Sequence, residues 1–231
     1  MNDPPRVVSL VPSVTETLLS WGVTPVAVTR FCETDGLKTV GGTKNPDIGS
    51  IVSLGPDVVF MDEEENRIED ARALRDAGVV VHATCVRNLA GAAVALDQLA
   101  GIVGVRSRSD RPEEPDPPVV RVWVPIWRRP WMTVNGDTYG SDLLAHAGLD
   151  NVCSAESERY PTVTIDEARA REPDVVLAPS EPYRFSERHR AELEEVARVE
   201  FVDGRDLFWW GTRTPGAIGR MRALAARIPG R

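Results

Sequence analysis

The second half of the chain repeats the order of elements found in the first half. In the first half, an apolar run at 7–13 (VVSLVPS) precedes a segment at 15–23 with helical spacing that ends near a glycine. In the second half, the run at 121–127 (RVWVPIW) and the segment at 141–149 have the same character. Each pair predicts a buried strand, a loop and a helix that stops at glycine.

A shared tetrapeptide, Pro-Asp-Val-Val, continues the repeat. It lies within 51–60 (IVSLGPDVVF) and within 168–177 (ARAREPDVVL), where it predicts a helix end, a break and a buried strand. A charged helix and a further strand follow each copy, at 68–77 and 79–83, and at 186–197 and 199–202. Matched elements lie about 115 to 125 residues apart and keep one order. The chain is therefore predicted to hold two copies of one α/β unit.

Strands that alternate with helices predict parallel sheets covered on both faces. The predicted fold class is α/β, with two lobes that each have a central parallel sheet flanked by helices. The lobes are expected at 1–87 and 119–231, joined through 88–118 by one short inter-lobe helix at 88–105 and a polar, Pro-rich linker at 106–118. Ligands bind beyond the carboxyl ends of such strands, so a cleft between the lobes is the predicted site.

The segments that follow the predicted strands hold the candidate ligand-binding residues. Four of the six tryptophans lie in such segments of the second half, beside arginines. A Trp in a polar loop next to Arg favours a large, partly planar or anionic ligand. The alternative is that these rings only anchor loops to the lobe surface. The candidates are Arg30, Phe31, Lys44, Glu64, Trp127, Arg128, Trp131, Tyr160, Arg184, Trp209, Trp210 and Arg213.

The acidic run at 62–65 admits two interpretations. The helix dipole favours carboxylates in the first turn of a helix, so the run is typical of a solvated helix start. In the functional interpretation, Glu64 or Glu65 reaches the ligand or fixes a cationic group there.

Composition and motifs argue against several function classes. A net charge of -8 argues against a nucleic-acid partner, which needs a basic face. The sequence has no G-x-S-x-G, H-E-x-x-H or C-x-x-C motif, and the three histidines, His82, His146 and His189, fall outside the candidate loops. We therefore expect a binding protein and not an enzyme, with no catalytic residues, no metal site and no cofactor.

Targeting signals are also absent from the sequence as written. No apolar run reaches the roughly 18 residues of a membrane span, and the first residues do not match the pattern of a secretory signal. The expected location is cytoplasmic as encoded, or periplasmic or extracellular if the true start lies upstream.

Four segments resemble the helical-backbone periplasmic binding proteins, the receptors for vitamin B12, iron–siderophore and haem uptake. They are 6–32 (RVVSLVPSVTETLLSWGVTPVAVTRFC), 41–67 (GGTKNPDIGSIVSLGPDVVFMDEEENR), 131–152 (WMTVNGDTYGSDLLAHAGLDNV) and 206–218 (DLFWWGTRTPGAI). The vitamin B12-binding branch is the most similar. The resemblance implies two α/β lobes bridged by a helix and a small-molecule ligand, a corrinoid or metal chelate. By position it places Phe31, Trp127, Trp131 and Trp209 or Trp210 near that ligand, with Arg213 as a polar contact.

The resemblance also implies an ABC transporter permease as a partner. Such receptors dock through one acidic residue per lobe, at positions that correspond here to Gly49 and Asp166. One docking acid is therefore missing, although Asp47 is nearby, and the bridging helix is shorter than is usual in the family. Four interpretations stay open: a chelate-binding protein uncoupled from import, a true uptake receptor, an enzyme or chelatase-like protein on the same scaffold, and an interaction module without a small ligand.

Overall fold

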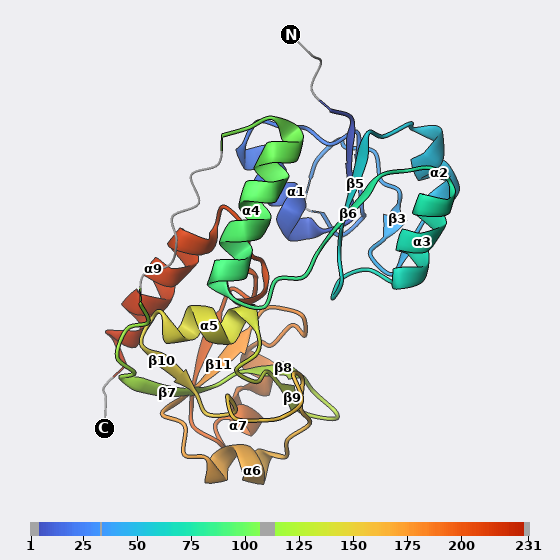
Figure 1. The fold of residues 1–231 in the computed structure, drawn as a ribbon. Helices are drawn as coiled ribbons and strands as arrows, with labels where there is room; N and C mark the ends of the chain where they lie inside the picture. The colour runs from blue at the N-terminus through green and yellow to red at the C-terminus, as the bar shows by residue number, and fades with distance from the viewer. Residues whose placement is uncertain (1–4, 33, 107–113, 229–231) are drawn as a thin grey trace. The chain divides into compact units, whose positions relative to one another are not determined.

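The computed structural model describes residues 5–32, 34–106 and 114–228. Contacts divide the chain into two units, Met1–Val86 with Gly91–Asp110 and Arg87–Ala90 with Arg111–Arg231. Each unit holds a four-stranded parallel sheet with helices packed beside it (Figure 1). The predicted α/β fold class is therefore confirmed. Of the predicted linker at 106–118, residues 107–113 lie outside the described residues.

Unit 1 has the strand order β2-β1-β5-β6. Helices α1 and α4 lie on one side of its sheet, and α2 and α3 lie on the other (Figure 1). The elements are β1 (Val7–Ser9), α1 (Pro12–Ser20), β2 (Ala27–Val28), the hairpin of β3 (Gly41–Gly42) and β4 (Asn45–Pro46), α2 (Ile48–Ser53), β5 (Val58–Asp62), α3 (Ile68–Asp76), β6 (Val81–Thr84) and α4 (Leu89–Val103).

Unit 2 has the strand order β10-β7-β11-β12, which is the same order in matched elements. The predicted repeat is thus present in the fold. The elements are β7 (Val120–Trp123), the hairpin of β8 (Pro125–Trp127) and β9 (Met132–Thr133), α5 (Tyr139–Ala145), β10 (Leu149–Asn151), α6 (Ile165–Ala170), β11 (Val175–Pro179), the 3-10 turn η1 (Glu187–His189), α7 (Arg190–Leu193), β12 (Arg198–Val202), α8 (Arg205–Phe208) and α9 (Thr214–Ala225).

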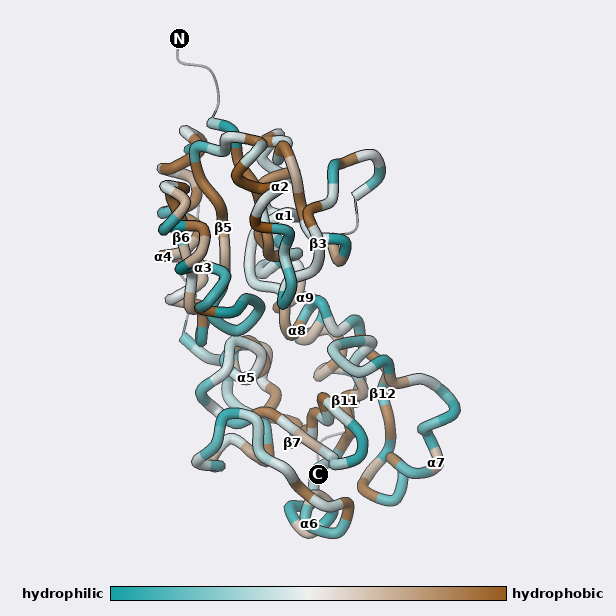
Figure 2. Tube along the Cα trace, turned by 90° about the vertical axis from the view of Figure 1, so that its right-hand side faces the viewer, coloured by the Kyte–Doolittle hydropathy of each residue, from teal (hydrophilic) through white to brown (hydrophobic). Residues whose placement is uncertain are grey.

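Alternating side chains of the strands build one core cluster in each unit. In unit 1, Val59 and Met61 of β5 pack with Leu74 of α3. In unit 2, Trp123 and Val176 pack in the same way beneath α6 and α7. Figure 2 shows β5 as predominantly hydrophobic along its length. Both central strands are buried at every position, as expected of parallel strands covered on two faces.

One arginine–aspartate clamp occurs in both units. The Asp57 carboxylate accepts a hydrogen bond from the Arg6 backbone N–H (2.7 Å), and the Arg6 carbonyl accepts one from the Asp57 N–H (2.8 Å). Asp174 and Arg121 make the same two bonds, both at 2.8 Å. Each guanidinium also donates to a carbonyl just beyond a helix, after α2 at 2.7 Å and after α6 at 3.0 Å. The clamp ties the start of the first strand to the Pro-Asp break and the preceding helix.

The clamp corrects the sequence alignment of the two halves by one residue. The apolar runs suggested that Val7 corresponds to Arg121. In the sheets, Val7 is paired with Val58 and Val122 with Val175. Because Val58 and Val175 hold the same place in Pro-Asp-Val-Val, Val7 corresponds to Val122. The run at 121–127 misled because its first residue, Arg121, corresponds to Arg6, which precedes β1 and the apolar run at 7–13.

Two predicted elements differ from the structure. The chain at 11–13, expected as a loop, begins α1, with Pro in the first helical turn, where no N–H is needed. The charged helix expected at 186–197 is only η1 and α7. There the Ser186 N–H donates to His189 Nδ1 (3.1 Å), and the His189 ring packs on Phe185 (5.6 Å between centroids). These contacts hold the first turn as a 3-10 turn. A helix is present within the segment 88–105, as α4, whereas its role as a bridge between lobes stays a prediction.

Within the described part of the chain, no helix combines the length and the apolar character that crossing a bilayer requires.

Candidate functional site

The four candidates of unit 1 gather around the β3–β4 hairpin. The Arg30 guanidinium carbon lies 5.0 Å from the centre of the Phe31 ring, and Phe31 is 52% exposed. Gly42 permits this packing, because an added Cβ would lie 3.1 Å from the ring and 3.3 Å from the Arg30 guanidinium. In the hairpin turn, Lys44 Nζ donates to the Glu64 backbone carbonyl (2.6 Å). The contact made by Glu64 therefore uses its main chain.

Asn66 holds this hairpin in place and was not among the predicted residues. Its Nδ2 donates to the carbonyls of Leu10 (3.2 Å) and Thr43 (2.9 Å), and its Oδ1 accepts from the Asp62 N–H (2.8 Å). The side chain thus joins the ends of β1 and β5 to the hairpin. Nothing in the local sequence distinguishes it from a loop asparagine, because its partners are as many as 56 residues away.

Asp62 shows that the acidic run is not a helix start. It is the last residue of β5, is 5% exposed, and α3 begins only at Ile68. Its carboxylate accepts hydrogen bonds from Thr84 Oγ1 (2.7 Å) and from the Glu64 N–H (2.9 Å). Burial raises the pKa of Asp62 above its usual value, and these hydrogen bonds offset only part of that effect.

Asp62→Asn is expected to become more stable relative to the wild type as the pH rises. Because the pKa of Asp62 is raised in the folded state, the folded state binds the proton more tightly than the unfolded state. The stabilisation that comes from the Asp62 proton is complete below the pKa of Asp62 in the unfolded state. It is lost as the pH rises through the higher pKa of Asp62 in the folded state. Thermal unfolding of both proteins from pH about 4 to 7 measures this difference. Two parallel stability curves would contradict the assignment.

An aromatic group fills the space beside the sheet of unit 2. Trp131 stacks on Phe185 with 5.9 Å between ring centroids and an angle of 6°, and it lies 5.8 Å from the buried Trp123. Trp131 is therefore packed against the core. At the outer end, Trp127 is 46% exposed and meets Tyr183 edge-on at 5.5 Å.

The other candidates of this region differ in their exposure and in the contacts that they already make. Arg128 forms an ion pair with Glu192 at 2.7 Å, and that contact raises the pKa of Arg128. Tyr160 is 38% exposed and Arg184 is exposed, whereas Trp210 is buried at 5%. Trp210 thus offers little of its ring surface.

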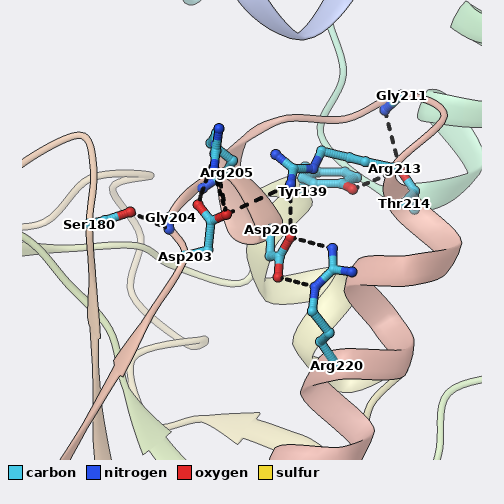
Figure 3. A network of polar contacts seen from close by, with 10 residues as sticks. All are labelled: Tyr139, Ser180, Asp203, Gly204, Arg205, Asp206, Gly211, Arg213, Thr214 and Arg220. Atoms are coloured by element: carbon cyan, nitrogen blue, oxygen red, sulfur yellow. Dashed lines mark hydrogen bonds and ion pairs between the residues drawn. The ribbon is translucent and has the colours of Figure 1, made fainter. Parts of the chain in front are cut away.

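The last loop of unit 2 holds Trp209 beside a network of charged side chains. Figure 3 shows the polar contacts of that network, which involve Asp203, Asp206 and three arginines. The guanidinium carbons of Arg205 and Arg213 lie 5.9 and 5.8 Å from the centre of the Trp209 ring. Arg213 Nη2 is 3.2 Å from Asp206 Oδ1, and Arg205 Nη2 is 3.0 Å from Asp203 Oδ2. The structure therefore brings Trp209 and Arg213 together, whereas their contact with a ligand stays a prediction.

Two further features fix this loop. The Tyr139 hydroxyl and Thr214 Oγ1 are 2.9 Å apart, and Thr214 Oγ1 accepts a hydrogen bond from the Gly211 N–H (3.2 Å). Burial raises the pKa of Tyr139, so its hydroxyl stays protonated at neutral pH. For Asp203, burial opposes the charge but the hydrogen bonds from Arg205 outweigh it and lower the pKa. The guanidiniums of Arg205 and Arg213 thus lie near the ionised carboxylate of Asp203.

Comparison of the chain with known proteins identifies its fold. No protein-family model matches the chain. A vitamin B12-binding protein of Vibrio campbellii is 23% identical over 192 residues, which cover 75% of this chain and 70% of that protein. The crystal structure of the periplasmic vitamin B12-binding protein BtuF of Vibrio cholerae matches with a TM-score of 0.78 at 18% identity, covering 97% of this chain and 98% of that one. A periplasmic haem-binding protein from Pseudomonas aeruginosa matches with a TM-score of 0.80 at 20% identity, covering 99% and 95%.

The chain has the fold of the periplasmic vitamin B12- and haem-binding proteins. The resemblance drawn from the four sequence segments is thereby confirmed. These neighbours are named as binding proteins, not as enzymes.

The two positions that the sequence resemblance assigned to docking, Gly49 and Asp166, lie in matching helices of the two units. Asp166 lies in the first turn of α6, its side chain is 87% exposed, and it pairs with Arg169 at 2.7 Å. Gly49 lies in the matching helix, α2. The nearby Asp47 caps α2 through the Ser50 N–H (3.0 Å), and this bonding lowers the pKa of Asp47. Only Asp166 of the two positions therefore carries a carboxylate.

The residues that the structure describes include no cluster of three or more His, Cys, Asp and Glu side chains that could hold a metal ion.

Proposed function

We propose that this protein binds a metal chelate or corrinoid, such as cobalamin, a ferric siderophore or a haem-like molecule. The observation that carries the proposal is the Trp209 ring with the guanidiniums of Arg205 and Arg213 at 5.9 and 5.8 Å. An indole with guanidiniums beside it suits a flat ring system that carries polar or anionic substituents. Relatives with this fold that are named for vitamin B12 and haem binding support the same ligand class.

Three rings are assigned to stacking and the cations around them to polar contacts. In unit 2 these are the exposed Trp127 and the half-buried Trp209 with Arg213, and in unit 1 the exposed Phe31 with Arg30. Lys44, Glu64, Arg128, Tyr160 and Arg184 complete the proposed set. Trp131 and Trp210 are assigned to packing, because one stacks in the core aromatic group and the other is 5% exposed.

The proposed role is binding without turnover, as the substrate-binding component of an uptake system. An ABC transporter permease is the partner that this role implies, with Asp166 as the docking acid on unit 2. The proposed location is periplasmic or extracellular, because the similar binding proteins of known structure are periplasmic.

A thermal-shift screen tests the proposal. The wild type, Trp209→Ala, Arg213→Ala and the control Arg72→Ala are heated with cobalamin, cobinamide, haem and several ferric siderophores. A ligand at 100 times its Kd stabilises the folded state by about 2.7 kcal/mol. Loss of a stacking or charged contact is expected to weaken binding about 10-fold to 100-fold, which removes half or more of that shift. Arg72 is exposed on α3 and is expected to leave the shift unchanged.

Two outcomes would contradict this function. If none of the probes raised the midpoint of thermal unfolding, the proposed ligand class would be wrong. Recovery of a chemically altered ligand after incubation would favour the enzyme interpretation over binding.

A further inference from the structure

Asn66 joins three segments of unit 1 that lie far apart in the sequence. The residue is 6% exposed, and its Nδ2 donates to two main-chain carbonyls, of Leu10 after β1 (3.2 Å) and of Thr43 in the hairpin turn (2.9 Å). Its Oδ1 accepts from the Asp62 N–H at the end of β5 (2.8 Å). Two carbonyls on one side and an N–H on the other match the two ends of an amide, which carries donors and acceptors together. Burial of these groups without partners is costly, so the amide suits this place.

The loop that carries Asn66 is itself bonded to the sheet. The Asn66 N–H donates to the Asp62 carbonyl (2.9 Å) and closes a turn at the end of β5. The Asp62 carboxylate accepts from Thr84 Oγ1 on β6 (2.7 Å), and the Glu63 N–H donates to the Thr84 carbonyl (2.9 Å). Asn66 therefore extends its amide to the hairpin from a loop that two neighbouring strands hold in place.

The hairpin in turn lies directly against Arg30 and Phe31. The Arg30 N–H donates to the Gly41 carbonyl (2.9 Å). At Gly42, an added Cβ would lie 3.1 Å from the Phe31 ring and 3.3 Å from the Arg30 guanidinium, so main chain and side chains are in close contact. The Phe31 ring is 52% exposed, with that guanidinium 5.0 Å from its centre. A movement of the hairpin would therefore displace the ring and the cation together.

We propose that Asn66 is a positioning residue that sets where Phe31 and Arg30 meet the ligand, by holding the β3–β4 hairpin to the ends of β1 and β5. The inference rests on the proposed function and deepens it, because it names the side chain that pre-organises the binding surface of unit 1. A ring and a cation that are held in place before binding lose less conformational entropy when a ligand arrives. Without the Asn66 amide, the Leu10 and Thr43 carbonyls lose their donor and the hairpin loses its tie to the sheet.

Two variants remove this tie in different ways. Asn66→Ala removes the amide without adding charge, whereas Asn66→Asp keeps the size of the side chain but places a carboxylate against two carbonyls. At pH about 8, both are expected to bind cyanocobalamin, cobinamide or haem about tenfold to hundredfold more weakly than the wild type, the size of two lost hydrogen bonds. Affinity is measured by quenching of Trp fluorescence.

Leu74→Ala is the matched control for stability. Leu74 belongs to the core cluster of unit 1, so its truncation destabilises the same unit but keeps every hydrogen bond of Asn66. It is expected to bind the same probe with the affinity of the wild type. Should Asn66→Ala fail to fold, Asn66→Ser replaces it, because a hydroxyl can still serve one of the partners of the amide.

A change of pH provides the rescue that a loss of structure alone would not show. Protonation of the introduced carboxyl, which burial beside two carbonyls favours, restores an O–H donor toward the Thr43 carbonyl. The affinity of Asn66→Asp relative to the wild type is therefore expected to recover severalfold between pH about 8 and about 5.5. The affinity of Asn66→Ala relative to the wild type is expected to stay the same. Comparison with the wild type at each pH cancels the titration of other groups, such as Asp62.

Hydrogen exchange of the Arg30 N–H is a readout that needs no ligand. This N–H is protected only while the hairpin stays in place, whereas the Val59 N–H donates to the Val80 carbonyl inside the sheet (2.9 Å). In Asn66→Ala, the Arg30 N–H is expected to exchange about tenfold to hundredfold faster, beyond any change at Val59. In Leu74→Ala, the two sites are expected to change together.

The outcomes separate this inference from the proposed function. Exchange at Arg30 that follows Val59 in Asn66→Ala, or wild-type affinity in both Asn66 variants, would overturn the positioning role alone. Weaker binding by Asn66→Asp but not by Asn66→Ala would assign the effect to charge and also overturn it. Failure of the wild type to bind every probe would overturn the proposed function, and the ligand role of Asn66 with it, even if the exchange result held.

Discussion

Trp131→Ala is expected to lower the free energy of unfolding of unit 2 by about 3 kcal/mol, at the low end of the range for such truncations. Trp131 stacks on Phe185, contacts Trp123 and packs against the core cluster of unit 2. Its removal leaves a cavity between a loop and that core, and the neighbouring rings cannot close it without moving strand β7. We expect the midpoint of thermal unfolding to fall by roughly 10 °C and the near-ultraviolet circular dichroism of the aromatic group to decrease.

Trp127→Ala is the matched control for that loss. Trp127 lies in the same loop region but is 46% exposed, and its ring meets Tyr183 edge-on at 5.5 Å between centroids. Its truncation is expected to cost less than about 1 kcal/mol in stability. If Trp131→Ala were instead as stable as the wild type but weaker in ligand binding, Trp131 would be a ligand residue, as the sequence first suggested.

The repeat made the fold predictable, because its evidence is local. Each copy of Pro-Asp-Val-Val marks a break and a buried central strand, and the helices between strands follow from their own periodicity. What the pattern could not supply was exact register. The clamp that aligns Arg6 with Arg121 depends on Asp57 and Asp174, each more than 50 residues away.

The candidate site was predictable only in part, since neighbours in sequence do not decide which ring a loop residue meets. Trp131 and Trp209 each lie within four residues of an arginine in the sequence. One packs on Phe185, 54 residues later, while the other has two guanidiniums within 6 Å of its ring centre. Asp206 was visible as a carboxylate, but nothing in its local sequence paired it with Arg220, which donates to both of its oxygens at 2.7 Å. Which buried charges pair here depends on how α8 packs against α9. The periodicity of the local sequence does not determine that packing.

Gly204→Ala is expected to destabilise unit 2 by about 1–3 kcal/mol, the range for overpacking, and to disturb the Trp209 loop. Gly204 precedes α8, and its N–H donates to Ser180 Oγ (2.9 Å). A Cβ added there would lie 2.6 Å from the backbone N, the backbone O and Cγ of Glu181. Because two of these atoms belong to the main chain, a side-chain rotation cannot relieve the clash. The first turn of α8, which carries Asp206, must move.

Gly219→Ala separates this steric effect from any general effect of replacing glycine. Gly219 lies inside α9 and has no atom within 4 Å of an added Cβ. Alanine there is expected to stabilise the helix by up to about 1 kcal/mol. Denaturant unfolding of both variants gives their stabilities. The 15N NMR signals of the Arg213 guanidinium report whether the Trp209 loop has changed. If the two variants had equal stability and equal Arg213 signals, the close approach of Gly204 to Glu181 would not be what places Asp206. If only Gly204→Ala lost both, the position of Asp206, and with it Arg213 beside Trp209, would depend on the absence of one methyl group.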